Sequence, residues 1–198
     1  MIEGYKKFLL FLIITLLLNL TAFAVWSKSD GDLIEIMLLD NLDDTRGFCI
    51  DIRGYKYKAK IERGLQVHTC YSYQSKIAVD QGLSAKRLNQ KELFFPYFDV
   101  CVYPTSFKKP LSLNLQKCKN KQIFIFGEDN TIRLKNNKNL CLTVVKENSK
   151  KGGGGSPVHL IRNLFMQDCN SQMLNFQTWG IRYFKKGKIF TEKISSYK

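Results

Sequence analysis

Few side chains of this 198-residue chain are suited to covalent chemistry, and the candidates are six cysteines and two histidines. His68 lies close to Cys70, and a neighbouring histidine can activate a cysteine nucleophile. That chemistry needs a free thiolate, whereas Cys70 has a disulfide partner in the repeat described below. Two histidines also make a three-histidine metal site impossible.

Other catalytic patterns are weak. The second histidine, His159, lies beside the glycines at 152–155, which lack the Lys-Ser/Thr ending of a phosphate-binding loop. No Cys-x-x-Cys motif occurs, and Asp43 and Asp44 fit a solvated loop better than a catalytic carboxylate pair. We therefore do not expect an enzyme, and we expect no catalytic residues, no metal and no cofactor.

The cysteines mark a repeat of short strands. The first, third and fifth each begin an apolar strand, over residues 49–52, 101–103 and 141–144. The others each end a strand in which apolar residues alternate with period 2, over residues 65–70, 113–118 and 164–169. A Gln-x-bulky element follows in each case: Gln81-Gly82-Leu83, Gln122-Ile123-Phe124 and Gln177-Thr178-Trp179.

This unit occurs three times, with starts 52 and 40 residues apart. Six cysteines allow many pairings, and the repeat selects pairing within each unit: Cys49 with Cys70, Cys101 with Cys118, and Cys141 with Cys169. No amphipathic helix is evident after Ala24. The pattern predicts an all-β fold of many short strands, a barrel or a sandwich.

The first 24 residues resemble a secretory signal peptide in all three of its parts. Lys6 and Lys7 precede an apolar run over residues 8–18, and a small-x-small site follows at residues 22–24. The run is shorter than the roughly 20 residues of a transmembrane helix, although an uncleaved anchor remains the alternative. Cleavage would start the mature chain near Val25. Because all six cysteines follow it, we expect a secreted or periplasmic protein with disulfides.

Three such units resemble the ricin-type β-trefoil lectin family over about residues 32–183. The resemblance rests on the opening Cys49-Ile50-Asp51-Ile52-Arg53-Gly54, on the three matched cysteine pairs, and on Gln177-Thr178-Trp179, an instance of the Gln-x-Trp element of that family. It implies a β-trefoil in which each unit can hold a shallow sugar pocket. An Asp two residues after the first cysteine accepts hydrogen bonds from hydroxyls, and a ring two residues before the second cysteine stacks on the sugar.

By this resemblance only the first unit keeps a carbohydrate site. Asp51 takes the acceptor position and His68 the stacking position, while Gln66, Asp80 and Gln81 take nearby polar positions. Each of these residues also has a structural alternative, such as a turn cap for Asp51 or a local hydrogen bond for the glutamines. Tyr71 and Tyr73 follow the binding strand and are further candidates for its lining.

The other two units lack these residues. The second has Tyr103 and Gln116 at the two positions, and the third has Thr143 and Gln167. Their loss favours an alternative, a trefoil without sugar sites that binds a protein partner, as a toxin subunit or an inhibitor does.

A net charge of +14 supports a third reading, a polyanion binder acting through lysines. Anionic glycans and membrane surfaces are then the expected partners, and specific nucleic acid is not. The alternative is that the lysines only keep the surface soluble.

The sequence thus divides into a signal peptide (1–24), a short segment (25–32), a trefoil domain (33–184, repeats roughly 46–94, 95–136 and 137–184) and a basic tail (185–198), expected to trail from the domain.

Overall fold

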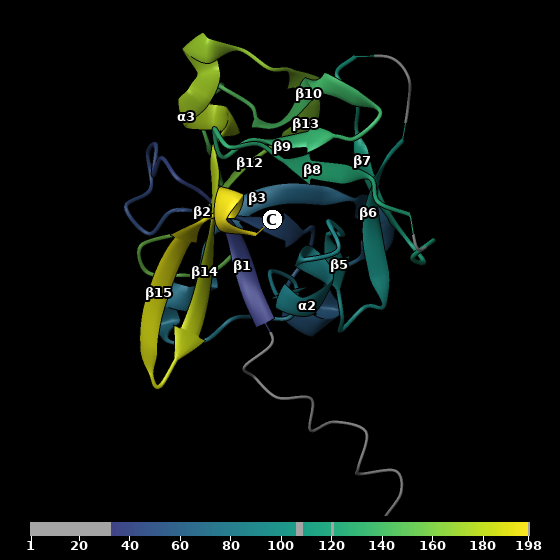
Figure 1. Ribbon diagram of the computed structural model, residues 1–198. Coiled ribbons are helices and arrows are strands. Elements are labelled where there is room, and N and C mark those ends of the chain that lie inside the picture. The colour runs from purple at the N-terminus through teal and green to yellow at the C-terminus, as the bar shows by residue number, and fades with distance from the viewer. Residues whose placement is uncertain (1–32, 106–108, 120, 198) are drawn as a thin grey trace, which may run out of the picture. The chain divides into compact units, whose positions relative to one another are not determined.

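The computed structural model describes residues 33–105, 109–119 and 121–197 of the chain (Figure 1). The predicted signal peptide and the segment after it lie outside the described residues. Within the described ranges, no helix is both long and apolar enough to cross a membrane.

Antiparallel strands are the main secondary structure of the described chain, as the all-β prediction requires. The largest sheet has the order β11-β12-β3-β2-β1-β14-β15, and β4 also pairs with β1. Its strands are β1 (Leu33–Leu38), β2 (Phe48–Ile52), β3 (Leu65–Thr69), β4 (Leu83–Ser84), β11 (Lys150–Lys151), β12 (Leu160–Arg162), β14 (Trp179–Lys185) and β15 (Lys188–Lys193).

Two smaller sheets complete the described fold. One has the order β13-β10-β9-β8 and the other β5-β6-β7. Their strands are β5 (Phe94–Phe95), β6 (Val100–Pro104), β7 (Leu113–Gln116), β8 (Phe124–Phe126), β9 (Ile132–Leu134), β10 (Asn137–Val144) and β13 (Leu164–Asp168).

In the residues that the structure describes, helices are confined to single turns, which hydrophobic periodicity cannot detect. Two of these turns are α-helical, α2 (Ala85–Leu88) and α3 (Leu174–Gln177). The others are 3₁₀ turns: η2 (Lys56–Lys58), η3 (Ile61–Arg63), η4 (Tyr71–Gln74), η5 (Ser171–Met173) and η6 (Ile194–Ser196).

The three cysteine-containing hairpins share one register. Each first cysteine lies opposite the residue two positions before the second cysteine: Cys49 opposite His68, Cys101 opposite Gln116, and Cys141 opposite Gln167. The disulfides join the cysteines of each hairpin as predicted, with Cα–Cα distances of 4.9, 5.0 and 5.0 Å. The local pairing inferred from the repeat is therefore confirmed.

The bulky residue of each Gln-x-bulky element lies in one shared hydrophobic core. Leu83, Phe124 and Trp179 are all fully buried, and they belong to a single cluster with apolar residues of all three sheets. The indole Nε1–H of Trp179 also donates to the carbonyl of Leu142, 3.0 Å away. The three repeats thus meet through equivalent positions.

The C-terminal segment does not trail from the domain, and that expectation is wrong. β15 pairs with β14 along its whole length, and Ile194 beyond it is fully buried. The segment contains a short run typical of a strand, Ile189-Phe190-Thr191, but its many lysines favour the prediction of a tail. The turn between β14 and β15 is formed by Lys186 and Gly187, which adopt positive φ values of 49° and 74°, as a tight hairpin turn requires.

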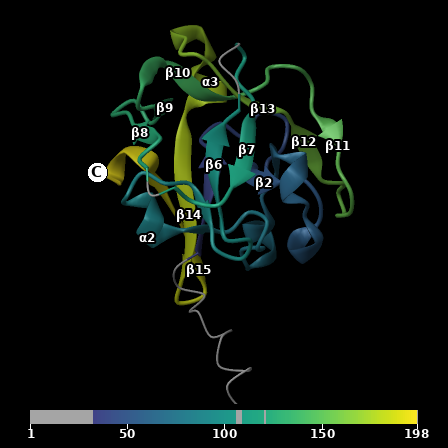
Figure 2. The same ribbon diagram turned by 90° about the vertical axis from the view of Figure 1, so that its right-hand side faces the viewer.

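β12 brings the third unit against the first. It pairs with β3, so that Ile161 lies opposite His68 and Arg162 opposite Val67. Figure 2 shows β12 and β11 beside the hairpin of the first unit. Residues separated by about half of the chain therefore become neighbours at the candidate site.

Candidate functional site

Two of the five predicted carbohydrate-binding residues, Gln66 and Gln81, approach the carboxylate of a third, Asp51. Asp51 on β2 lies directly opposite Gln66 on β3, and the amide of Gln66 donates to Asp51 Oδ1 at 2.7 Å. Gln81, just before β4, places its amide nitrogen 3.4 Å from Asp51 Oδ2. The structure thus joins residues that are up to 30 positions apart in the sequence.

Gln81 also ties this group to the backbone of the hairpin. Its side chain accepts the amide N–H of Tyr71 at 2.9 Å and donates to the carbonyl of Thr69 at 3.1 Å. The same amide nitrogen lies 3.4 Å from Nδ1 of His68. Gln81 therefore fixes the end of the strand that carries the candidate ring.

The third unit repeats this arrangement. Gln177 accepts the amide N–H of Asn170 at 2.9 Å, donates to the carbonyl of Asp168 at 3.0 Å, and donates to the hydroxyl of Thr143 at 2.9 Å. Each partner has the same position relative to the cysteines as the partners of Gln81. The Gln of the repeat is thus a structural clasp, and Asp51 and Thr143 are its equivalent inner partners.

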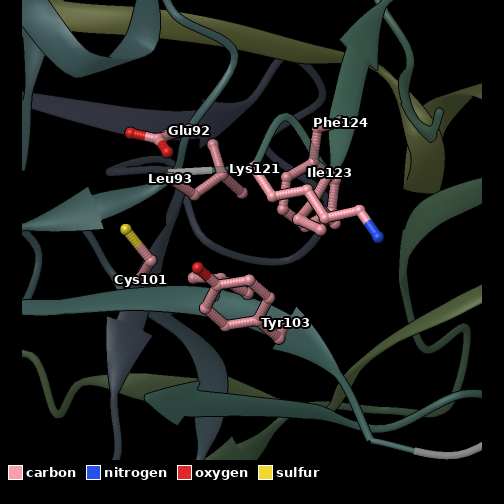
Figure 3. Close-up of a pocket in the computed structure, with 8 residues that line it drawn as sticks. Glu92, Leu93, Cys101, Tyr103, Lys121, Ile123 and Phe124 are labelled. Carbon is pink, nitrogen blue, oxygen red and sulfur yellow. The ribbon is translucent and has the colours of Figure 1, made fainter. Parts of the chain in front are cut away.

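The second unit reaches the same end with a different side chain. Tyr103 stands at the Asp51 position, and its hydroxyl accepts the amide N–H of Lys119 at 2.7 Å. This is the backbone group that Gln81 and Gln177 accept in their own units. The hollow beside it, shown in Figure 3, is lined by the Tyr103 ring and by Phe124, and the ammonium of Lys121 points away from it.

All five candidate residues are buried, which the sequence did not indicate. Asp51 is 1% exposed, His68 4% and Gln66 6%, and Asp80 and Gln81 have no exposed surface. His68 packs against the rings of Tyr71 and His159, at centroid distances of 5.1 and 4.9 Å. In this structure its ring is a packing element, not an open platform for a sugar.

The loop at residues 55–64 covers the carboxylates. The backbone N–H of Lys56 donates to Asp80 Oδ2, and the ammonium of Lys56 lies 5.6 Å from the centroid of the Tyr71 ring. Within the described residues, Asp80 Oδ1 is buried without a hydrogen-bond partner. A buried acceptor of this kind is costly unless it is protonated or finds a donor.

Burial sets the protonation of this cluster. It raises the pKa of Asp51 well above its ordinary value, and the charge of Asp80 raises that pKa further. Burial raises the pKa of Asp80 as well, and lowers the pKa of His68 to about 4. The imidazole of His68 is therefore neutral at neutral pH, and the repulsion between two buried carboxylates favours the protonated form of at least one of them.

His159, Tyr73, Asp44 and Thr69 complete the junction and were not identified as a group from the sequence. The hydroxyl of Tyr73 lies 2.7 Å from Nε2 of His159. The hydroxyl of Thr69 donates to Asp44 at 2.6 Å and accepts the N–H of Leu160 at 2.8 Å. The Tyr73–His159 and Thr69–Leu160 contacts join residues that lie 86 and 91 positions apart, so no local spacing could have indicated them.

An open polar hollow lies beside the buried cluster. It has a cavity volume of about 80 Å³, and Arg53, Gln66, Lys150 and Asn163 are among the residues that line it. Arg53 donates to the side chains of Gln66 at 3.3 Å and of Asn163 at 2.8 Å. Gln66 therefore joins the hollow on one side to Asp51 on the other.

Metal and thiol chemistry find no support in the described residues. The one group of potential metal ligands there is Glu35 with Cys49 and Cys70. Both cysteines form a disulfide, so neither offers a thiolate.

No family model matches this chain, and no curated protein is detectably similar to it.

Glu35 is buried beside Ser72. Its carboxyl should make the stability of the folded protein depend on pH. It accepts the N–H of Ser72 at 3.0 Å, and burial raises its pKa from 4.5 to about 7. A carboxyl with a raised folded-state pKa stabilises the fold fully below its unfolded pKa and loses that contribution as the pH rises through the folded pKa. We expect the melting temperature of the wild type to fall as the pH rises from about 4.5 to about 7. Glu35→Gln should remove the contribution of Glu35 to this loss of stability, which is on the order of 3 kcal/mol.

Thermal melts across this pH range check the prediction. Glu62→Gln on η3 changes an exposed glutamate and serves as the matched control. A pH profile that is the same for the wild type and Glu35→Gln would show that Glu35 does not bind a proton on folding.

Proposed function

We propose that this chain is a β-trefoil and an exported, non-catalytic carbohydrate-binding protein with its site in the first unit. The trefoil is supported by three disulfide-linked hairpins of one register and by the polar clasp that recurs in each unit. Three disulfides are typical of proteins that fold in oxidising compartments. This supports a secreted or periplasmic location.

The link from the open hollow through Gln66 to Asp51 carries the binding proposal. The hollow offers amide, guanidinium and ammonium donors, and Glu147 offers an acceptor. Saccharide hydroxyls need such paired donors and acceptors, and the side chains of Val145 and Ile161 add apolar surface. Arg162 is already paired with Asp43, but the remaining cations, Arg53 and Lys150, exceed the one acidic residue, Glu147. A saccharide with an acidic group therefore fits best.

Direct contact with Asp51 requires the loop at residues 55–64 to move. The Lys56 N–H donated to Asp80 is one of the contacts that hold this loop over the carboxylates, together with the Lys60 N–H donated to the carbonyl of Arg53. The loop has an exposed outer surface, with Tyr55 and Tyr57 at 52% and 60% exposure. Its displacement would expose the carboxylates and bring the Tyr rings beside the incoming ligand.

A glycan array at two salt concentrations tests the proposal. We expect Gln66→Ala to weaken saccharide binding roughly tenfold or more, since it removes the group between the hollow and Asp51. Asn114→Ala is the matched control, because Asn114 holds the same position before the second cysteine in the second unit. Equal binding by Gln66→Ala and the wild type would overturn the site assignment.

The burial of all five candidate residues favours a second function, a trefoil that binds a protein partner through its surface. This alternative predicts a partner that free sugar does not displace and that Gln66→Ala leaves bound. Binding that depends on salt alone, and is equal in both variants, would instead indicate a polyanion binder.

A further inference from the structure

The hairpin formed by β14 and β15 exposes apolar side chains on both of its faces. Tyr183 pairs with Phe190 on one face, and Phe184 pairs with Ile189 on the other. Ile189 and Phe190 are 45% and 40% exposed. A surface hairpin normally packs one face against the protein, and Tyr183 does pack against the hydrophobic core. The apolar surface that Ile189 and Phe190 still expose on the two faces needs an explanation.

The turn of this hairpin is cationic. Lys185 and Lys188 pair across the end of the strands, and Lys186 lies in the turn between them. All three lysines are exposed. Within the described residues, Glu192 is the acidic residue of the hairpin, and it accepts the hydroxyl of Tyr183 near the base and not at the turn. The apolar pairs and the charges therefore lie next to each other at the free end.

We propose that this hairpin end inserts into the surface of an anionic lipid bilayer. Lysines next to the apolar pairs attract anionic headgroups, while the rings and Ile189 enter the boundary between headgroups and acyl chains. The lysine stems can extend to keep their ammonium groups at headgroup level. A bilayer fits both apolar faces at once, whereas a soluble polyanion offers them no apolar environment.

The position of the hairpin permits this contact. β15 is the last strand of the largest sheet, and the turn lies at the margin of the molecule in both views (Figures 1 and 2). The candidate saccharide site involves β2 and β3, with β1 and β14 between β2 and β15 in the sheet. This proposal does not depend on the saccharide site.

Co-sedimentation of the full-length mature protein with vesicles tests the proposal. The vesicles are phosphatidylcholine alone, and phosphatidylcholine with about one third phosphatidylserine. We expect binding to the second kind only. Changing Lys185, Lys186 and Lys188 together to Glu should weaken that binding by roughly a hundredfold, and Ile189→Thr with Phe190→Thr should weaken it by about tenfold or more without any change of charge.

A matched control uses the opposite edge of the same sheet. Changing Lys146, Lys150 and Lys151 together to Glu makes the same change of charge near and on β11. We expect this variant to retain most of the binding, and thermal melts to show that each variant is folded.

Three results would overturn the proposal. One is equal loss of binding in the two charge variants, which would show adsorption by net charge. Another is full binding by the Thr variant, which would show a polyanion-type contact without insertion. The third is equal binding to both kinds of vesicle.

Discussion

Replacing Asp51 by alanine should both unfold the protein at a lower temperature and abolish saccharide binding. The amide groups of Gln66 and Gln81 would lose their buried acceptor, and each such group costs about 1–3 kcal/mol. The carboxyl itself is buried and its pKa is raised, so the substitution disturbs the folded core as well as the site. Thermal melts and glycan binding measured on one preparation check both effects.

Asp51→Asn separates the two effects. Because burial favours the protonated carboxyl, asparagine is close to its shape and charge. The raised pKa of Asp51 makes the wild type lose stability as the pH rises above the ordinary Asp value, and Asn lacks that proton. We expect Asp51→Asn to match the wild type at low pH and to exceed it in melting temperature at about pH 8. An alanine variant as stable as the wild type would show that Asp51 is not part of the core.

Trp179→Ala should produce the largest loss of stability, about 3–5 kcal/mol. The indole is fully buried, lies in the cluster shared by the three sheets, and donates to the carbonyl of Leu142. Denaturant unfolding monitored by circular dichroism measures the loss. Phe124→Ala at the equivalent position of the second unit should cost a similar amount, because it is also fully buried.

Leu174→Ala on α3 is the control for this prediction. Leu174 lies close to Trp179 in the sequence but is 44% exposed, so we expect a change within about 0.5 kcal/mol. A loss at Trp179 no larger than the loss at Leu174 would contradict a core built from the repeated bulky positions.

The sequence predicts the three hairpins well because their signals are local. Each unit places its cysteines 17 to 28 residues apart, and the alternation before the second cysteine fixes which side chains face the core. The Gln-x-bulky elements were found by spacing alone, and their bulky residues are all buried.

The state of the candidate site was not predictable in the same way. Its residues can be identified one by one, but their burial depends on how the loop at Lys56 folds and on His159 and β12, which come from the third unit. β15 was missed for a different reason, since its lysines at the ends and turn outweighed a short apolar strand.

The contact between β12 and β3 also sets an order of assembly. The first hairpin and its disulfide are complete within residues 48–70, whereas His159 and Leu160 follow about 90 residues later. The ring of His68 lacks its third-unit neighbours until residues 159–162 have been made, and His159 and β12 then pack against it and its strand. The packing of the first hairpin is therefore completed by contacts from a late part of the chain.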